Sequence, residues 1–312
     1  MSTRNLEKHK PRRSAHSAVS SIEEWELVAE LGRGRWLPPY RARPRRLPPT
    51  GPADYVVKMP IEASDSELAT RMLRREAAIS QQVAHPHLQT VLSVHLDSAP
   101  NYLVLPYLAG GTWTEFSTSP RWRLLPRRLW IFRQLAEGLR ALHGAGWIHG
   151  DIAPGNVHVA TSGHATLIDL GMSYRRETDC DYQASFRGTL QYAAPESLVS
   201  SRPIGPCSDI YSLGVLLFQT LSGRLPFRPS DQAHLVRAHR CATPPSLRRL
   251  VPQLPSGLVC LVEQMLAKEP LRRPLAEELA KRLIDLEVAT FSETLCPGAA
   301  VQLVSPCTRK VA

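Results

Sequence analysis

The stretch "HGDIAPGNVHVATSGHATLIDLG", residues 149–171, decides the fold. It places Asp151 and Asn156 in a loop after a long apolar segment, and it ends in the run "ATLIDLG", which contains Asp169. An unpaired carboxylate at the end of a buried strand is costly, so we expect Asp169 to have a charged or metal partner. The loop is typical of phosphoryl transfer, in which oxygen ligands hold a divalent metal ion.

Phosphoryl transfer also needs a cation on the phosphates of the nucleotide. Lys58 lies in "VVK" on a predicted strand, and Glu76 lies in "RREAAI" on a predicted helix, where it could pair with the lysine. Taken singly, a lysine on a strand or a glutamate on a helix is usually solvated surface. The ordered set of five polar residues is what favours a site.

The hydrophobic pattern divides the chain into two parts. "WELVAELG", "DYVVKMP" and "NYLVLPY" are predicted strands, and "ELATRMLRREAAISQQV" is a predicted helix between them. Residues 126–147 have apolar side chains at helical spacing, ended by two glycines, and mostly helical segments follow. We therefore predict an α+β fold with a small β-rich lobe, about 21–106, and a larger helical lobe, about 107–288. Residues 1–20 are expected to be a disordered basic arm, and 289–312 a flexible tail.

The composition predicts a soluble globular protein, with 43% hydrophobic and 21% charged residues in 312. No apolar run reaches the roughly 18 residues of a membrane span, and the N-terminus lacks the apolar core of a signal peptide. The six cysteines are scattered without a C-x-x-C pair, which argues against a zinc site or a disulfide framework. We therefore expect a cytoplasmic protein.

The net charge of +10 is partly concentrated in "RNLEKHKPRR", residues 4–13, and "RARPRR", residues 41–46. The simplest interpretation is solvated surface and a flexible arm. Binding to nucleic acid is not expected, because no aromatic residues are interleaved with the charges and no nucleic-acid module is recognised.

Taken together, the motifs resemble those of the eukaryotic-type (Hanks-type) Ser/Thr protein kinases, from residue 25 to about residue 286. The matching stretches are "LGRG", "VVK", "RRE", "LVLPYLAGG", "HGDIAPGN", "DLG", "GTLQYAAPE", "SDIYSLG" and "RRP". The resemblance implies a two-lobed kinase fold, a catalytic-loop variant H-G-D, ATP as the phosphoryl donor and Mg²⁺, or Mn²⁺, as the metal. It also implies a protein acceptor, whose identity the sequence does not give.

The resemblance assigns a role to each polar residue. Asp151 is implied as the catalytic base, Lys58 as the contact to the α- and β-phosphates with Glu76 positioning it, and Asn156 and Asp169 as the metal ligands. The other implied nucleotide contacts are Gly32 and Gly34 in the glycine loop, Val56 above and His158 below the adenine, Leu105 at the gatekeeper place, the Pro106 carbonyl and the Leu108 N–H. In the large lobe, Asp209 is implied to brace the catalytic loop, Thr189 to be the Ser/Thr-type residue, and Arg273 to pair with Glu196.

The chain departs from the family pattern in the glycine loop. Leu37 occupies the third glycine place and Pro39 the following valine place. A side chain and a proline there should loosen or reshape the loop over the phosphates. The proline-rich stretch 41–52 is predicted to be an irregular connection, so we expect a modest affinity for nucleotide.

The catalytic loop lacks two cations that the family usually has there. Gly150 replaces an arginine that commonly binds a phosphate on the activation segment, so activity is predicted not to need phosphorylation of that segment. Ala153 replaces a lysine that neutralises the γ-phosphate. Losing one preorganised donor costs on the order of 10² to 10³ in rate, which slows an enzyme without abolishing it.

Three functions are compatible with these residues. An active Ser/Thr protein kinase is favoured, because all five polar residues are present. A small-molecule kinase of the aminoglycoside or choline type has a similar H-G-D loop, but it lacks the platform "GTLQYAAPE" and "SDIYSLG". The third function is a pseudokinase or scaffold. It is supported by the poor glycine loop, by Ala153 and by Ser80, which lies on the helix four residues after Glu76. Mg-ATP binding discriminates this third function from the first.

Overall fold

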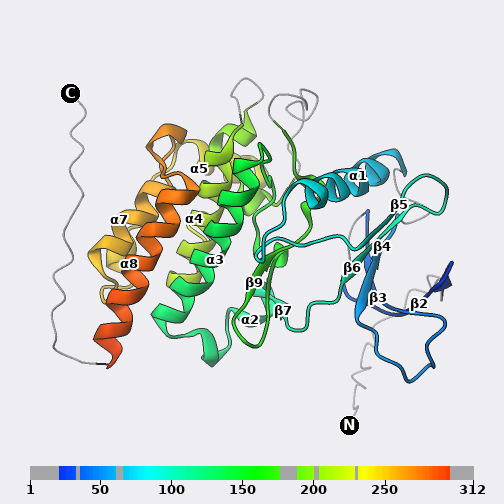
Figure 1. The fold of residues 1–312 in the computed structure, drawn as a ribbon. Helices are drawn as coiled ribbons and strands as arrows, with labels where there is room; N and C mark the ends of the chain where they lie inside the picture. The colour runs from blue at the N-terminus through cyan, green and yellow to red at the C-terminus, as the bar shows by residue number, and fades with distance from the viewer. Residues whose placement is uncertain are drawn as a thin grey trace, which may run out of the picture.

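The computed structural model describes residues 21–32, 36–60, 66–175, 188–199, 204–228 and 231–295. The chain forms a small lobe built on a sheet and a larger lobe built from helices (Figure 1). The predicted α+β, two-lobed fold is therefore confirmed.

The small lobe contains an antiparallel sheet in the order β1-β2-β3-β4-β6-β5. Its strands are β1 (Ser21–Ile22), β2 (Trp25–Glu30), β3 (Pro39–Pro44), β4 (Tyr55–Lys58), β5 (Ser93–His95) and β6 (Tyr102–Pro106). Helix α1 (Ser66–Gln82) packs on the sheet: its Met72 and Leu73 share a buried cluster with Leu103 and Leu105 of β6. This packing carries Glu76 toward the end of β4.

The predicted irregular connection over residues 41–52 is wrong at its start, because β3 extends to Pro44. The arginines there are not simply solvated, since Arg43 forms a two-pronged ion pair with Glu26 at 2.9 and 3.0 Å. Pro39 and Pro44 lie at the two ends of the strand, where a missing N–H disturbs the sheet least.

The large lobe is organised around two buried helices, α3 (Leu125–Gly144) and α4 (Pro206–Ser222). The other helices are α2 (Trp113–Phe116), α5 (Gln232–Cys241), α6 (Leu247–Leu250), α7 (Ser256–Met265) and α8 (Ala276–Leu295). The predicted helix over 126–147 is confirmed as α3, and α8 runs alongside it (Figure 1). Helix α8 continues past residue 288, where we placed the end of the domain.

A second, three-stranded sheet lies at the junction of the lobes and holds the catalytic loop. It pairs β7 (Gly111–Thr112), β8 (Val157–Val159) and β9 (Ala165–Leu167) in that order. Every residue of β8 and β9 is buried. The catalytic loop precedes β8 and Asp169 follows β9, so this sheet places the two ends of the opening stretch close together.

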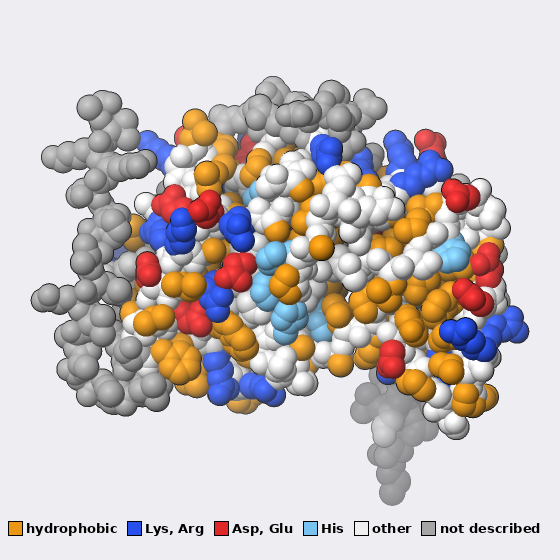
Figure 2. Space-filling view, in the orientation of Figure 1, with side chains coloured by type: hydrophobic (Ala, Val, Ile, Leu, Met, Phe, Trp, Pro, Cys, Tyr) orange, Lys and Arg blue, Asp and Glu red, His pale blue; other side chains and the backbone are white. Residues whose placement is uncertain are grey.

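The surface shows mixed charges on the face drawn in Figure 2. Lysine and arginine side chains are interspersed with aspartate and glutamate over both lobes there, without one large basic patch. Among the residues that the structure describes, no helix has the length and apolar character needed to cross a bilayer.

Candidate active site

Lys58 and Glu76 of the small lobe meet Asp169 of the large lobe at the junction of the two lobes. The Lys58 ammonium contacts both carboxylate oxygens of Glu76, at 3.0 and 2.9 Å, and one oxygen of Asp169 at 3.0 Å. Glu76 has 0% of its side chain exposed, whereas 37% of the Asp169 side chain is exposed. The predicted pair of Lys58 and Glu76 therefore forms, and the Asp169 side chain remains partly exposed.

The charges of this cluster favour the ionised forms of Lys58 and Asp169. Burial alone would lower the pKa of Lys58, but the nearby carboxylates of Asp169 and Glu76 raise it above its usual value. Burial would raise the pKa of Asp169, but the charge and hydrogen bond of Lys58 outweigh burial and lower it. Asp169 is therefore a carboxylate at neutral pH, as a metal ligand must be.

Asp169 has an unusual backbone that its sequence neighbours do not explain. Its φ is +64°, in the left-handed region, which non-glycine residues adopt rarely and mostly at functional sites. The side-chain oxygen of Gln89 accepts a hydrogen bond from the Asp169 N–H at 3.0 Å. Our sequence analysis missed Gln89, because nothing in "HPHLQT" indicates a partner that lies 80 residues away.

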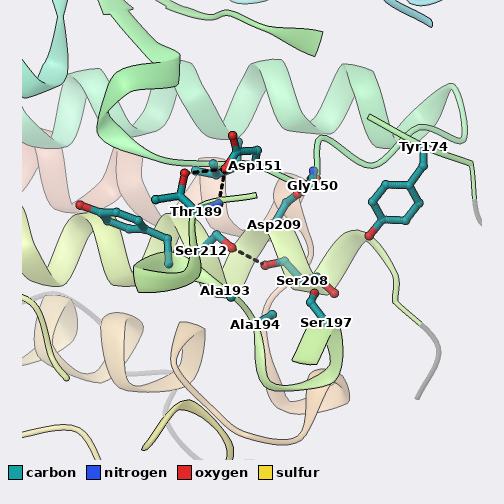
Figure 3. Close-up of a pocket in the computed structure, with 12 residues that line it drawn as sticks. Gly150, Asp151, Tyr174, Thr189, Ala193, Ala194, Ser197, Ser208, Asp209 and Ser212 are labelled. Carbon is teal, nitrogen blue, oxygen red and sulfur yellow. Dashed lines mark hydrogen bonds between the residues drawn. The ribbon is translucent and has the colours of Figure 1, made fainter. Parts of the chain in front are cut away.

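Asp151 is held from both sides of its carboxylate. The Thr189 N–H and hydroxyl both donate to Asp151 Oδ1 at 2.8 Å, as the dashed lines in Figure 3 show. The Asn156 amide donates to Asp151 Oδ2 and to its backbone carbonyl, each at 2.8 Å. Thr189 comes from the stretch "GTLQYAAPE", so the catalytic loop and the predicted substrate platform are joined at this carboxylate.

Asp209 on helix α4 supports the loop from below. Its carboxylate accepts hydrogen bonds from the N–H groups of His149 and Gly150 at 2.8 and 2.9 Å, and from the His143 ring at 2.8 Å. Burial would raise the pKa of Asp209, but these contacts, with His143 first, lower it. The hydrogen bonds by which Asp209 was predicted to brace the loop are therefore formed.

The end of the substrate platform is fixed by a second buried ion pair. Arg273 contacts both oxygens of Glu196, at 2.5 and 2.9 Å, and the Ser208 hydroxyl donates to the same carboxylate at 2.7 Å. Both charged side chains are almost fully buried. The predicted pairing of these residues is therefore formed, and removing either partner would leave a buried charge uncompensated.

The residues around Asp169 fit a magnesium–nucleotide complex. The Asn156 amide nitrogen donates two hydrogen bonds to Asp151, which leaves the carboxamide oxygen as the atom that would bind a metal ion. In the described part of the chain, no three His, Cys, Asp or Glu side chains converge into a metal cluster. A magnesium ion with one carboxylate, one amide oxygen and phosphate oxygens as ligands does not need such a cluster.

The predicted adenine contacts come from both lobes. Val56 and Leu105 lie in one buried cluster, and His158 on β8 is buried as well. Burial lowers the pKa of His158, while a hydrogen bond to the Leu108 backbone opposes the shift. Pro106 ends β6, at the expected junction of the lobes. Gly32 is described, but Gly34 lies outside the described residues.

Leu37 and Ser80, two departures from the family pattern, have surroundings that the sequence did not indicate. Leu37, at the third glycine place, is only 5% exposed and belongs to the cluster that contains Val56 and Leu105. Ser80 is not a simple defect, because its hydroxyl accepts a hydrogen bond from the Val91 N–H at 2.7 Å. The inward direction of the Leu37 side chain could not be predicted, because the preceding residues carry no clear strand pattern.

A two-lobed fold with paired Lys58 and Glu76, a carboxylate after β9 and a braced H-G-D loop defines the class of phosphoryl-transfer proteins. The model of the protein kinase domain matches residues 28–283, and the chain belongs to the protein kinase family.

Several relatives carry the name of Ser/Thr protein kinases. The chain is 34% identical over 223 residues to serine/threonine-protein kinase pkn2 of Myxococcus xanthus, covering 67% of this chain and 26% of that protein. It is 28% identical over 286 residues to serine/threonine-protein kinase ULK3 of Xenopus laevis, covering 89% and 59%. It is 29% identical over 213 residues to serine/threonine-protein kinase PrkC of Bacillus subtilis, covering 68% and 32%. The chain thus spans less than two thirds of the length of each of these relatives.

Proposed function

We propose that this chain is an ATP-dependent Ser/Thr protein kinase that transfers the γ-phosphoryl group of ATP to a protein hydroxyl. The observation that carries the proposal is the simultaneous contact of Lys58 with Glu76 and Asp169. This contact brings the proposed phosphate-binding cation and the proposed metal ligand together. The bonds between Asp151 and Thr189 add a reason to expect a protein acceptor.

In the proposed reaction, the acceptor hydroxyl oxygen attacks the γ-phosphorus while the bond to the β,γ-bridging oxygen breaks and ADP leaves. Asp151 orients the hydroxyl and takes its proton, since its carboxylate is fixed by Asn156 and Thr189. Lys58 holds the α- and β-phosphates and is itself oriented by Glu76. A magnesium ion, when bound by Asn156 and Asp169, neutralises charge that develops on the phosphates.

The remaining proposed nucleotide contacts are those to the adenine base and those from the loop over the phosphates. We assign Val56, Leu105 and His158 to the adenine, the backbones of Pro106 and Leu108 to its polar edge, and Gly32 and Gly34 to the loop over the phosphates. Mn²⁺ is an alternative metal, since its preference for oxygen ligands is similar. The cytoplasmic location also stays a proposal, which rests on the scattered cysteines.

The proposed activity does not depend on a phosphorylated activation segment. Gly150 stands at the place of the arginine that would read such a phosphate, and its N–H is already bonded to Asp209. Glycine has no side chain with which to pair with a phosphate.

A scaffold with weak or no turnover is the second candidate, and the burial of Leu37 favours it. A buried isobutyl group in the cluster with Val56 and Leu105 lies near the space that the nucleotide would take. A small-molecule acceptor is disfavoured, because the Glu196–Arg273 platform is built and anchored.

The deciding experiment uses the full chain and γ-³²P-labelled ATP, in Mg²⁺ and separately in Mn²⁺, with a Ser/Thr peptide library as acceptor. Mass spectrometry then locates the phosphate. We expect labelled Ser or Thr in either metal. No labelling and no thermal shift with millimolar Mg-ATP would replace the kinase proposal with the scaffold, whereas a thermal shift without labelling would point to a different acceptor.

A further inference from the structure

The space beside Gly150 is already filled by a tyrosine. Gly150 has φ +78°, and a Cβ atom built on it would lie 2.8 Å from Cε1 of the Tyr174 ring and 3.3 Å from the Met172 carbonyl oxygen. Both the backbone and the ring therefore exclude a side chain at position 150. Figure 3 shows the Tyr174 ring beside the loop that carries Gly150 and Asp151. Glycine at 150 and tyrosine at 174 are thus a matched pair.

The Tyr174 ring packs between residues that flank the activation segment, which we define as the chain between Asp169 and Glu196. It is 4% exposed and forms a buried cluster with Ile148 and Ile204. Ile148 directly precedes the catalytic loop, while Ile204 lies between the A-P-E stretch and helix α4. We call these three side chains the segment clasp.

Backbone hydrogen bonds reinforce the segment clasp on the loop side. The Ile148 N–H donates to the Tyr174 carbonyl at 2.9 Å, and the Tyr174 N–H donates to the Ile148 carbonyl at 3.0 Å. The next residue, Arg175, lies over the Trp147 ring at 4.6 Å from its centroid. A displacement of Tyr174 would therefore be passed to the chain that carries Asp151.

The cavity beside Gly150 and Tyr174 is small. The cavity drawn in Figure 3, lined by Gly150, Asp151, Tyr174 and Thr189 among others, has a volume of about 10 Å³. A cavity of that size holds about one water molecule.

We propose that Tyr174 is a positioning residue, and that the segment clasp holds Asp151 and the described residues of the activation segment, 169–175 and 188–196, in register by apolar packing. The inference rests on the proposed kinase function, and it goes further by naming what replaces the missing arginine. An ion pair to a phosphate exists only after modification, whereas a packed ring is always present. The arrangement should therefore be built in rather than switched on.

The test compares Tyr174→Ala with Tyr174→Phe in the full chain. Leu283→Ala is the control, because Leu283 is fully buried on α8 and its loss should reduce stability without touching the segment. Three quantities are measured for each variant: kcat on the Ser/Thr peptide library, Kd for Mg-ATP, and amide hydrogen exchange in residues 188–199. Thermal melting corrects kcat for the folded fraction.

We expect Tyr174→Ala to lower kcat by about tenfold or more and to increase exchange in residues 188–199, with Kd for Mg-ATP unchanged. Tyr174→Phe keeps the ring, so both kcat and exchange should stay near wild type. If Tyr174→Ala does not fold, Ile204→Val, which trims the same cluster by one methyl group, should produce the same changes at smaller size.

Two outcomes overturn the inference. One is wild-type kcat and exchange in Tyr174→Ala, or in Ile204→Val if the alanine variant does not fold. The other is a Tyr174→Phe variant as impaired as Tyr174→Ala, which would move the effect from the ring to the hydroxyl. A wild-type chain without turnover would instead contradict the proposed function. Exchange in residues 188–199 would still decide whether the segment clasp holds the segment.

Discussion

On the nucleotide side of the cleft, Lys58 keeps charged contacts with Glu76 and Asp169 at 2.9–3.0 Å. On the catalytic-loop side, Gly150 and Ala153 stand where the family usually has two cations, and both are enclosed by neighbouring side chains. One side has retained its charges, and the other has exchanged them for small residues and packing. The nucleotide side therefore depends on charged side chains, and the catalytic-loop side depends on packing.

Comparing the two sides indicates which charged interactions can be replaced by packing and which cannot. A group that binds a metal or phosphate must carry charge, because no apolar contact offsets the charge of a nucleotide in a cleft of low dielectric. A group that only orients the backbone can be replaced by any well-packed side chain. We therefore expect changes on the nucleotide side to have the largest effects and to be the least tolerant of substitution.

Asp169→Asn should break the nucleotide side most severely. The change removes the carboxylate that contacts Lys58 and, by our assignment, binds the metal. Turnover should fall by more than about 10²-fold, since even one preorganised donor is worth that much. Mg-dependent nucleotide binding, followed by calorimetry with and without Mg²⁺, should weaken as well.

The matched control for that change is Asp285→Asn, an equally small change to an exposed carboxylate on α8. It should leave turnover and nucleotide binding as they are. Wild-type turnover in Asp169→Asn would show that the metal ligand has been assigned to the wrong residue.

Ala153→Lys tests the catalytic-loop side by restoring one missing cation. A lysine beside Asp151 should raise turnover by about tenfold, less than the 10²–10³ of a fully preorganised donor. Ala153 is only 4% exposed, so the new stem must reach out of a packed site. Ala153→Met, which has a similar length and no charge, is therefore measured in parallel.

The sign of that change separates the proposed functions. In a protein kinase the lysine variant should exceed both wild type and the methionine variant. A lower rate would be expected if the acceptor were a small molecule, because the lysine would enter its pocket. Equal rates for the lysine and methionine variants would show that the charge at 153 is not what limits turnover.

Removing the hydroxyls of Thr178, Tyr182 and Ser185 tests whether the loop side depends on modification. These residues lie outside the described part of the chain. Because Gly150 cannot pair with a phosphate, the triple variant with Ala, Phe and Ala should keep most of the wild-type rate. A loss of about tenfold or more would mean that another residue reads a phosphate, with Arg175, Arg176 and Arg187 as the residues to substitute next.

Much of this comparison could be predicted from the sequence, for a physical reason. Strand and helix periodicity and the order of polar motifs specify the lobes, and the pairing of Lys58 with Glu76 follows from where those elements must pack. The partner of Gly150 could not be predicted, because its contact with Tyr174 depends on φ and on a ring direction that no local pattern encodes. The inward side chain of Leu37 and the hydrogen bond from the Asp169 N–H to Gln89 depend likewise on the assembled lobes.

The smallest expected effect is a pH dependence of nucleotide binding that comes from His158. Burial lowers the pKa of this ring below its usual 6.5, and the nearby His164 adds to that shift while Glu115 and the Leu108 backbone oppose it. The ring is therefore neutral at pH 7, and stacking of adenine on it would bury it further. Protonation would then have to be reversed before nucleotide binds.

The sign of the pH dependence follows from that linkage. Above pH 6.5 the imidazole is neutral in both free and bound protein, so Kd for Mg-ATP should not change through this group. As the pH falls through the lowered pKa, binding must release a proton, and affinity should fall by at most about tenfold per pH unit.

His158→Leu removes the titrating group, so the ratio of wild-type to variant Kd, in which the nucleotide's own titration cancels, should rise only on the acid side. At pH 7 the two proteins should differ by no more than about twofold. A ratio that stays constant from pH 5 to pH 8 would place His158 away from the adenine.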